Sequence, residues 1–141
     1  LLIMPETSLL WICNIFGVVV LVTGIVCLIQ YARSIEKEKG KNFRFTLTTN
    51  GMNIDDDVIE FANKECHNVV LSLDGRKEIH DAKRVTASGK GSYDTIVPKF
   101  QKLVQARGGK GYYMRGTYTH FNTDFTNDIF HMALAAQPPE Q

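Results

Sequence analysis

The length, charge and cysteine content of this 141-residue chain exclude several classes of protein. The chain is long enough for one domain with a hydrophobic core and too short for a complete eight-stranded (β/α) barrel enzyme. Sixteen Lys and Arg against fifteen Asp and Glu give a net charge of +1, so we expect no nucleic-acid partner. Cys13, Cys27 and Cys66 lie far apart and match neither a disulfide framework nor a metal-binding C-x-x-C spacing.

The first 34 residues form a segment distinct from the rest of the chain. Residues 9–30 are predominantly apolar and uncharged, which is long enough for a helix that crosses a bilayer. A cationic stretch, Arg33 to Arg44, follows it, and the positive-inside bias then predicts that the remaining domain lies on the cytoplasmic side. A buried helix, or the translation of a damaged coding sequence, would have the same composition.

Residues 41–136 have the composition of an ordinary soluble domain. Apolar and polar residues alternate over residues 43–49 and predict a strand that ends at the turn Asn50-Gly51. Three aspartates at residues 55–57 suit the N-terminus of a following helix. A second strand is expected at residues 68–73, with an apolar run typical of a parallel strand covered by helices on both faces.

The same alternation of strand and helix continues to the end of the chain. After a polar loop at residues 74–91, Ser92 is positioned to cap a helix that contains Pro98 and ends at Gly108-Gly109. Residues 112–119 predict a third strand, and a last helix is expected from Thr123 or Thr126 until the prolines at 138 and 139. This order predicts an α/β fold with about three parallel strands.

Polar residues cluster at the predicted carboxyl ends of the strands, where parallel α/β proteins bind their ligands. The first strand ends in Thr49 and Asn50, and the second in Ser72 and Asp74. Such groups suit a polar ligand. The alternatives are a plain turn at Asn50-Gly51, a strand terminator at Asp74 and a solvated loop charge at Arg84.

Five ordered segments carry a family resemblance: LTTNG at 47–51, VLSLDGRKEIHD at 70–81 with Arg84 after it, GKGSYD at 89–94, IVPKF at 96–100 and RGTYT at 115–119. Together they resemble radical S-adenosylmethionine enzymes with SPASM-type extensions. Within that group they are most similar to the maturases that install thioether crosslinks in SCIFF peptides. The resemblance covers roughly residues 31–133.

The resemblance implies a fold, a cofactor set and a site. It implies part of a (β/α) barrel, a [4Fe-4S] cluster that cleaves S-adenosylmethionine to a 5'-deoxyadenosyl radical, and a ribosomally made precursor peptide as the partner. By the same resemblance, Thr49, Asn50 and Ser72 line the S-adenosylmethionine pocket. Arg84 pairs bidentately with the methionyl carboxylate, and Asp74 shapes the same loop.

The chain departs from the family pattern where the iron chemistry should be. It contains no C-x3-C-x2-C loop for the cluster and no Gly-Gly-Glu-Pro turn. We therefore expect a cytoplasmic enzyme fragment that is inactive by itself. The chain also departs from the family pattern after residues 131–133, and reading-frame slips would explain the departures at both ends. The alternatives are a membrane-anchored, non-catalytic binding module for a nucleoside-like ligand or peptide, and a scaffold that does not depend on the strand-end residues.

Overall fold

The structure is a computed structural model that describes residues 6–120 and 122–137. It consists of two units, residues 1–43 and residues 44–141, and each is described by itself. The first unit contains helix α1 (Glu6–Lys39) and the segment that follows it, and the second contains the remaining helices and strands.

Helix α1 extends well beyond the predicted residues 9–30, into a charged final third. Glu36 there accepts hydrogen bonds from the Arg33 guanidinium and from the backbone N–H of Phe43. Lys37 and Lys39 lie in the last turn, where positive charge is favourable to the helix dipole. None of the helices in residues 6–120 and 122–137 is long and apolar enough to cross a membrane, so the predicted membrane span is not supported.

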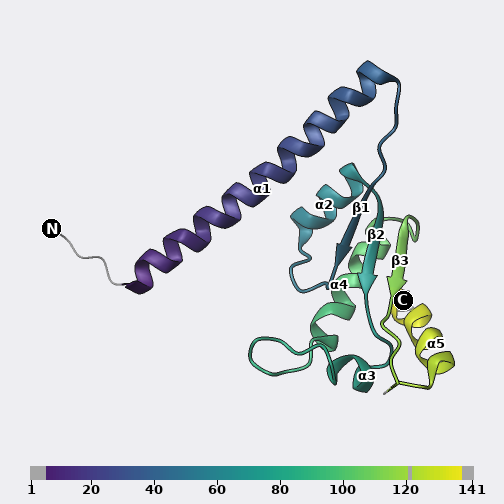
Figure 1. Ribbon diagram of the computed structural model, residues 1–141. Helices are drawn as coiled ribbons and strands as arrows, with labels where there is room; N and C mark the ends of the chain where they lie inside the picture. The colour runs from purple at the N-terminus through teal and green to yellow at the C-terminus, as the bar shows by residue number, and fades with distance from the viewer. Residues whose placement is uncertain (1–5, 121, 138–141) are drawn as a thin grey trace. The chain divides into compact units, whose positions relative to one another are not determined.

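The second unit is built on a three-stranded parallel sheet, as predicted. Strands β1 (Phe45–Thr49), β2 (Cys66–Ser72) and β3 (Tyr112–Arg115) lie side by side in that order. Both neighbouring pairs are parallel. Figure 1 shows all three arrows pointing to the same end of the sheet, the end near helix α3 (Lys77–Asp81) and the loop that follows it.

Three longer helices connect or follow the strands. They are α2 (Asp56–Glu65), α4 (Tyr93–Ala106) and α5 (Phe125–Ala135). Asp55 caps α2 by accepting a 2.9 Å hydrogen bond from the N–H of Val58, which explains why the acidic triplet predicted this helix start. Helix α4 continues through Pro98, and Gly108 and Gly109 follow its end with positive φ angles.

The core lies on one face of the sheet, between β2 and the helices α2 and α4. Val69, Leu71 and Leu73 are fully buried there against Phe100 and Ile96 of α4. The opposite face is more open and more polar: Thr46, Thr48, Tyr113 and Arg115 are exposed, and Val70 is only half-buried. The prediction that helices cover both faces of β2 therefore does not hold within this unit.

The turn after β1 is pressed into this core. Gly51 is buried with a φ of +85°, and a Cβ atom at this position would lie 2.4 Å from the Phe100 ring. Only glycine satisfies both the left-handed backbone and the close packing. The carboxyl end of β1 is thereby fixed against α4, beside the loop that carries Arg84.

Candidate ligand site at the carboxyl end of the sheet

The polar residues after β2 are organised around an ion pair between a buried aspartate and a partly exposed arginine. Arg84 donates to Asp74 from both Nε and Nη2, the second bond being 3.0 Å long. Asp74 is 8% exposed, and its Oδ1 also accepts a 2.8 Å hydrogen bond from the N–H of Thr117 after β3. The pair therefore joins the ends of two neighbouring strands to the loop after α3.

The electrostatics of this pair follow from its burial and its hydrogen bonds. Burial raises the pKa of Asp74, but the hydrogen bonds from Arg84 and Thr117 outweigh it and hold the pKa below its usual range. The hydrogen bond to Asp74 raises the pKa of Arg84. Both side chains are therefore charged across the physiological pH range.

The geometry leaves part of the guanidinium available to a ligand. A guanidinium has five N–H bonds, and Asp74 uses one on Nε and one on Nη2. The other three, on Nη1 and Nη2, have no acceptor among the described residues. The edge that joins Nη1 and Nη2 can therefore bind a carboxylate while Asp74 holds the adjacent edge, Nε and Nη2.

Two cavities adjoin Arg84 at this end of the sheet. The larger, about 380 Å³, is lined by Asp74, Ile79, Ala82, Lys83, Arg84, Thr117, Thr119 and Asn122. The smaller, about 190 Å³, is lined by Asn50, Met52, Arg84, Val85, Thr86 and Ser92. Because Arg84 lines both cavities, a ligand bound in either one could contact it.

The sequence-predicted residues are brought together only in part. Asp74, Arg84 and Asn50 line these cavities, whereas Thr49 and Ser72 do not. The oxygen atoms of the first turn are also engaged locally: Thr49 Oγ1 accepts from the N–H of Gly51, and Asn50 Oδ1 accepts from the N–H of Met52. Asn50 therefore has both amide N–H groups, and one further lone pair on its carbonyl oxygen, to offer a ligand.

Sequence reasoning missed a second set of residues that support the pair. His80 is fully buried on α3, inside a segment predicted as loop, and it hydrogen-bonds to Ser92. Ser92 was expected to cap α4, but its hydroxyl donates to the carbonyl oxygen of Arg84 instead. One sequence feature could have predicted that His80 is buried. Apolar Ile79 lies next to it in the segment 77–84, which is consistent with a helical turn that has one buried side.

A second buried carboxylate supports the backbone just after Asp74. Asp128 on α5 accepts from the backbone N–H and the Nε of Arg76, at 3.1 and 2.9 Å. Its other oxygen, Oδ2, is buried without a hydrogen-bond partner among the described residues. Gly75 packs directly on it, because a Cβ there would lie 2.6 Å from the Asp128 carboxyl carbon. Helix α5 thus anchors the loop that presents Asp74.

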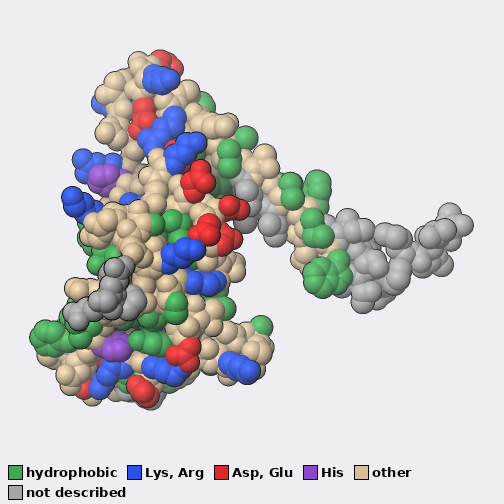
Figure 2. Space-filling model, turned by 180° about the vertical axis from the view of Figure 1, so that it is seen from behind, with side chains coloured by type: hydrophobic (Ala, Val, Ile, Leu, Met, Phe, Trp, Pro, Cys, Tyr) green, Lys and Arg blue, Asp and Glu red, His purple; other side chains and the backbone are tan. Residues whose placement is uncertain are grey.

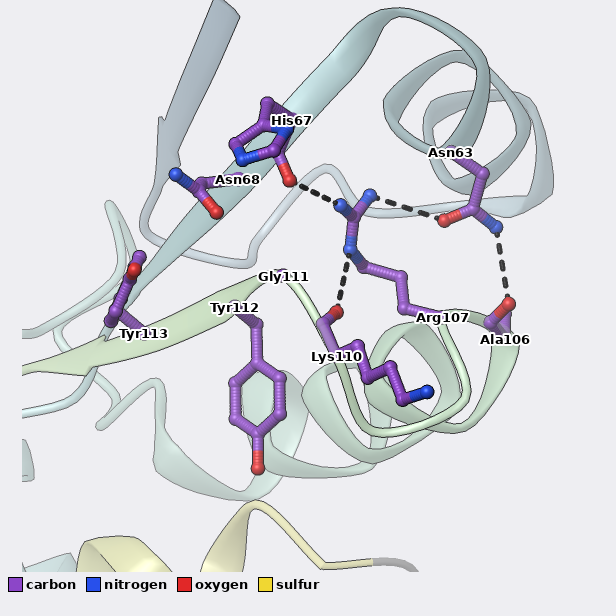
Figure 3. Close-up of a pocket in the computed structure, with 9 residues that line it drawn as sticks. All are labelled: Asn63, His67, Asn68, Ala106, Arg107, Lys110, Gly111, Tyr112 and Tyr113. Carbon is purple, nitrogen blue, oxygen red and sulfur yellow. Dashed lines mark hydrogen bonds between the residues drawn. The ribbon is translucent and has the colours of Figure 1, made fainter. Parts of the chain in front are cut away.

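The amino end of the sheet has a more open hollow of about 780 Å³, shown in Figure 3. Arg107 lies in this hollow, and each of its five N–H groups donates a hydrogen bond to another group of the protein. Nε donates to the Lys110 carbonyl, Nη1 to the Ala62 carbonyl and Asn63 Oδ1, and Nη2 to the carbonyls of Cys66 and His67. This arginine caps the end of α2 and leaves no N–H for a ligand.

The residues present do not fit an iron–sulfur cluster. Cys13 and Cys27 are exposed on α1, and Cys66 is buried at the start of β2. Among the described residues, no group of three or more His, Cys, Asp or Glu side chains is placed to hold a metal ion. Cluster ligation needs converging thiolates, which these three cysteines do not provide.

Comparisons with known proteins give matches to part of this chain. A cysteine-type anaerobic sulfatase-maturating enzyme from Clostridium novyi (strain NT) is 33% identical over 76 residues, which are 52% of this chain and 20% of that enzyme. Native anSMEcpe with bound AdoMet and Cp18Cys peptide matches with a TM-score of 0.63 at 19% identity, over 76% of this chain and 30% of that one. The same enzyme with Kp18Cys peptide gives 0.63 at 18%, over 77% and 31%.

A different family matches the N-terminal part of the chain. The family described as "Short repeat of unknown function (DUF308)" matches residues 1–49. The sulfatase-maturating relative is similar over about half of this chain. The structural matches establish the fold, and the chain spans about a fifth of the length of the curated relative.

Proposed function

We propose that this chain is a fragment of a radical S-adenosylmethionine peptide-modifying enzyme that keeps part of the S-adenosylmethionine site without the cluster-binding loop. The observation that carries the proposal is the Asp74–Arg84 pair. It holds a guanidinium at the carboxyl end of a parallel sheet with three N–H bonds still to donate. The solved neighbours, which contain AdoMet, support the same ligand class.

The role of this chain in the proposal is to bind and orient a ligand. When S-adenosylmethionine and a reduced cluster are both present, they supply the radical chemistry of such enzymes. Arg84 would receive the methionyl carboxylate on its Nη1–Nη2 edge, in a charge-assisted bidentate contact. Asp74 would keep the guanidinium in place, and Asn50 would offer its amide N–H groups from the adjoining cavity. Thr49 and Ser72 remain proposed pocket residues at the ends of β1 and β2.

The peptide partner and the cellular location are part of the same proposal. The solved neighbours contain bound peptides, and the curated relative is a maturating enzyme. A ribosomally made precursor peptide is therefore the proposed partner of the complete enzyme, in the cytoplasm. The motifs at residues 89–94, 96–100 and 115–119 favour the thioether-forming type of maturase, and this choice rests on sequence similarity.

Calorimetry with S-adenosylmethionine on the full chain tests the binding site. We expect measurable affinity that falls about tenfold or more in Arg84→Ala, because the carboxylate loses a charge-assisted contact. Arg44→Ala is the matched control, since Arg44 is exposed before β1 and lines neither cavity. Equal affinities of wild type and Arg84→Ala would refute the assigned site.

Anaerobic reconstitution with iron and sulfide tests the inactivity. We expect no stoichiometric [4Fe-4S] absorption and no cleavage of S-adenosylmethionine, because the thiolates do not converge. A stable cluster on this polypeptide alone would contradict the proposal.

The second candidate function is a non-catalytic binding module for a nucleoside-like ligand or peptide. It is favoured because the chain has the Arg84 site but lacks a set of cysteines that could bind a cluster. It predicts S-adenosylmethionine binding whose affinity does not increase when the rest of the barrel is supplied.

A further inference from the structure

His80 lies at the centre of a closed set of hydrogen bonds behind the Asp74–Arg84 pair. The backbone N–H of Asp74 donates to His80 Nδ1 at 3.2 Å, and His80 Nε2 lies 2.9 Å from Ser92 Oγ. The Ser92 hydroxyl donates to the Arg84 carbonyl at 2.9 Å. The Arg84 N–H in turn donates to the His80 carbonyl at 2.8 Å. One imidazole therefore ties the backbone at Asp74 to the backbone at Arg84.

The direction of each bond fixes the protonation of the ring. A backbone N–H can only donate, so Nδ1 must carry a lone pair. The Ser92 hydroxyl already donates to the Arg84 carbonyl, so it must accept from Nε2. The ring is therefore neutral with its proton on Nε2, and a second proton on Nδ1 would face the Asp74 N–H directly.

We propose that His80 is a positioning residue, which in its neutral Nε2–H form holds the backbone on both sides of the ion pair and so fixes the Arg84 guanidinium toward its ligand. This inference deepens the proposed function and rests on it for the identity of the ligand. His80 acts through Arg84, because it lines neither of the cavities at this end of the sheet.

The charged and titratable groups around His80 come from every element packed on it. Asp74 follows β2, Asp81 lies on its own helix, Arg84 follows α3, and the Tyr93 ring of α4 packs edge-on at 6.1 Å. Burial lowers the pKa of His80, Arg84 lowers it further, and the two aspartates oppose this. The ring therefore stays neutral at physiological pH, and the set of bonds opens only on acidification.

Nuclear magnetic resonance on the full chain tests the arrangement without any ligand. In the wild type we expect His80 to show a protonated Nε2 and an unprotonated Nδ1, and the Hε proton of Arg84 to exchange slowly with water. In His80→Phe, which keeps a ring in the core without hydrogen bonds, Arg84 Hε should exchange about tenfold faster or more. His80→Gln retains an acceptor and a donor and should restore slow exchange. His67→Gln, on an exposed site at the other end of the sheet, is the control.

Calorimetry with S-adenosylmethionine links the arrangement to the ligand. Wild-type affinity should fall about threefold or more once acidification protonates His80, which its ring resonances report, while His80→Gln should show no such fall. A proton on Nδ1, or slow Arg84 Hε exchange in His80→Phe, would overturn the positioning role. If His80→Phe does not fold, the comparison with His80→Gln decides. The positioning role is overturned if the affinity for S-adenosylmethionine depends on pH in the same way in His80→Gln and in the wild type. Absence of wild-type binding with the expected exchange rates would refute the proposed function and leave the positioning role intact.

Discussion

Arg107 and Arg84 lie at opposite ends of the same sheet and show how differently one side chain type is used. Arg107 donates every N–H to neighbouring carbonyls and to Asn63. Arg84 is held on one edge by Asp74 and keeps three N–H bonds without an acceptor among the described residues. The more open hollow surrounds the arginine that has nothing left to donate. The N–H bonds that Arg84 still has to donate, and not the volume of the cavity, are the reason why the ligand site is proposed at this end of the sheet.

Removing Arg107 should have the largest effect on stability. Arg107→Ala leaves the carbonyls of Ala62, Cys66 and His67 without this donor, and we expect the free energy of unfolding to fall by about 2–3 kcal/mol. Urea denaturation measures it. Affinity of the folded protein for S-adenosylmethionine should not change. A change in that affinity with little loss of stability would reverse the roles assigned to the two arginines.

Replacing Asp74 should weaken stability and ligand binding together. In Asp74→Asn the partly buried guanidinium loses its ionic partner, and we expect a loss of about 2 kcal/mol at neutral pH. The pKa of Asp74 is lowered in the folded state, so its contribution is present above the unfolded value and is lost as the pH falls through the lowered one. The acid limb of a stability-against-pH curve should therefore be shallower in Asp74→Asn. An unchanged limb would show that the pair contributes nothing to stability.

The smallest effect is expected at Asn63, the one side chain that Arg107 contacts with a hydrogen bond. Asn63 is exposed, and its Oδ1 accepts from Nη1 at 3.2 Å. Water replaces it at little cost, so Asn63→Ala should reduce stability by about 0.5 kcal/mol or less. The same denaturation series measures it. A loss comparable to that of Arg107→Ala would mean that the side chain, and not the carbonyls, holds this arginine.

The sheet was predictable because its signals are local. Alternation over Phe45–Thr49, the acidic start at Asp55 and the apolar run around Leu71 each depend on a few neighbouring residues, and parallel pairing follows from the order of elements. The end of β3 was less predictable. Polar Thr117 and Thr119 fit a strand pattern, but Thr117 turns away to donate its N–H to Asp74.

The support behind the site was not predictable from sequence. His80, Ser92 and Asp128 are ordinary polar residues of a helix or a loop until the chain brings them next to Asp74 and Arg76. No periodicity marks them, because their partners are up to 52 residues away. Asn50 was singled out by its place at the end of the first strand and Arg84 by the family resemblance, and only the structure supplied the detail that Asp74 occupies one edge of the guanidinium.

The order of the strands also bears on how the second unit behaves in concentrated solution. Among the described residues, β1 and β3 each pair on one side only, which leaves a row of backbone groups along both outer edges. Such rows are templates for further strands, and two unequal ones on the same body favour head-to-tail growth over closed dimers. Turbidity that rises steeply with protein concentration, and that falls when Tyr113→Lys adds a charge to the exposed face of β3, is the expected sign of this growth.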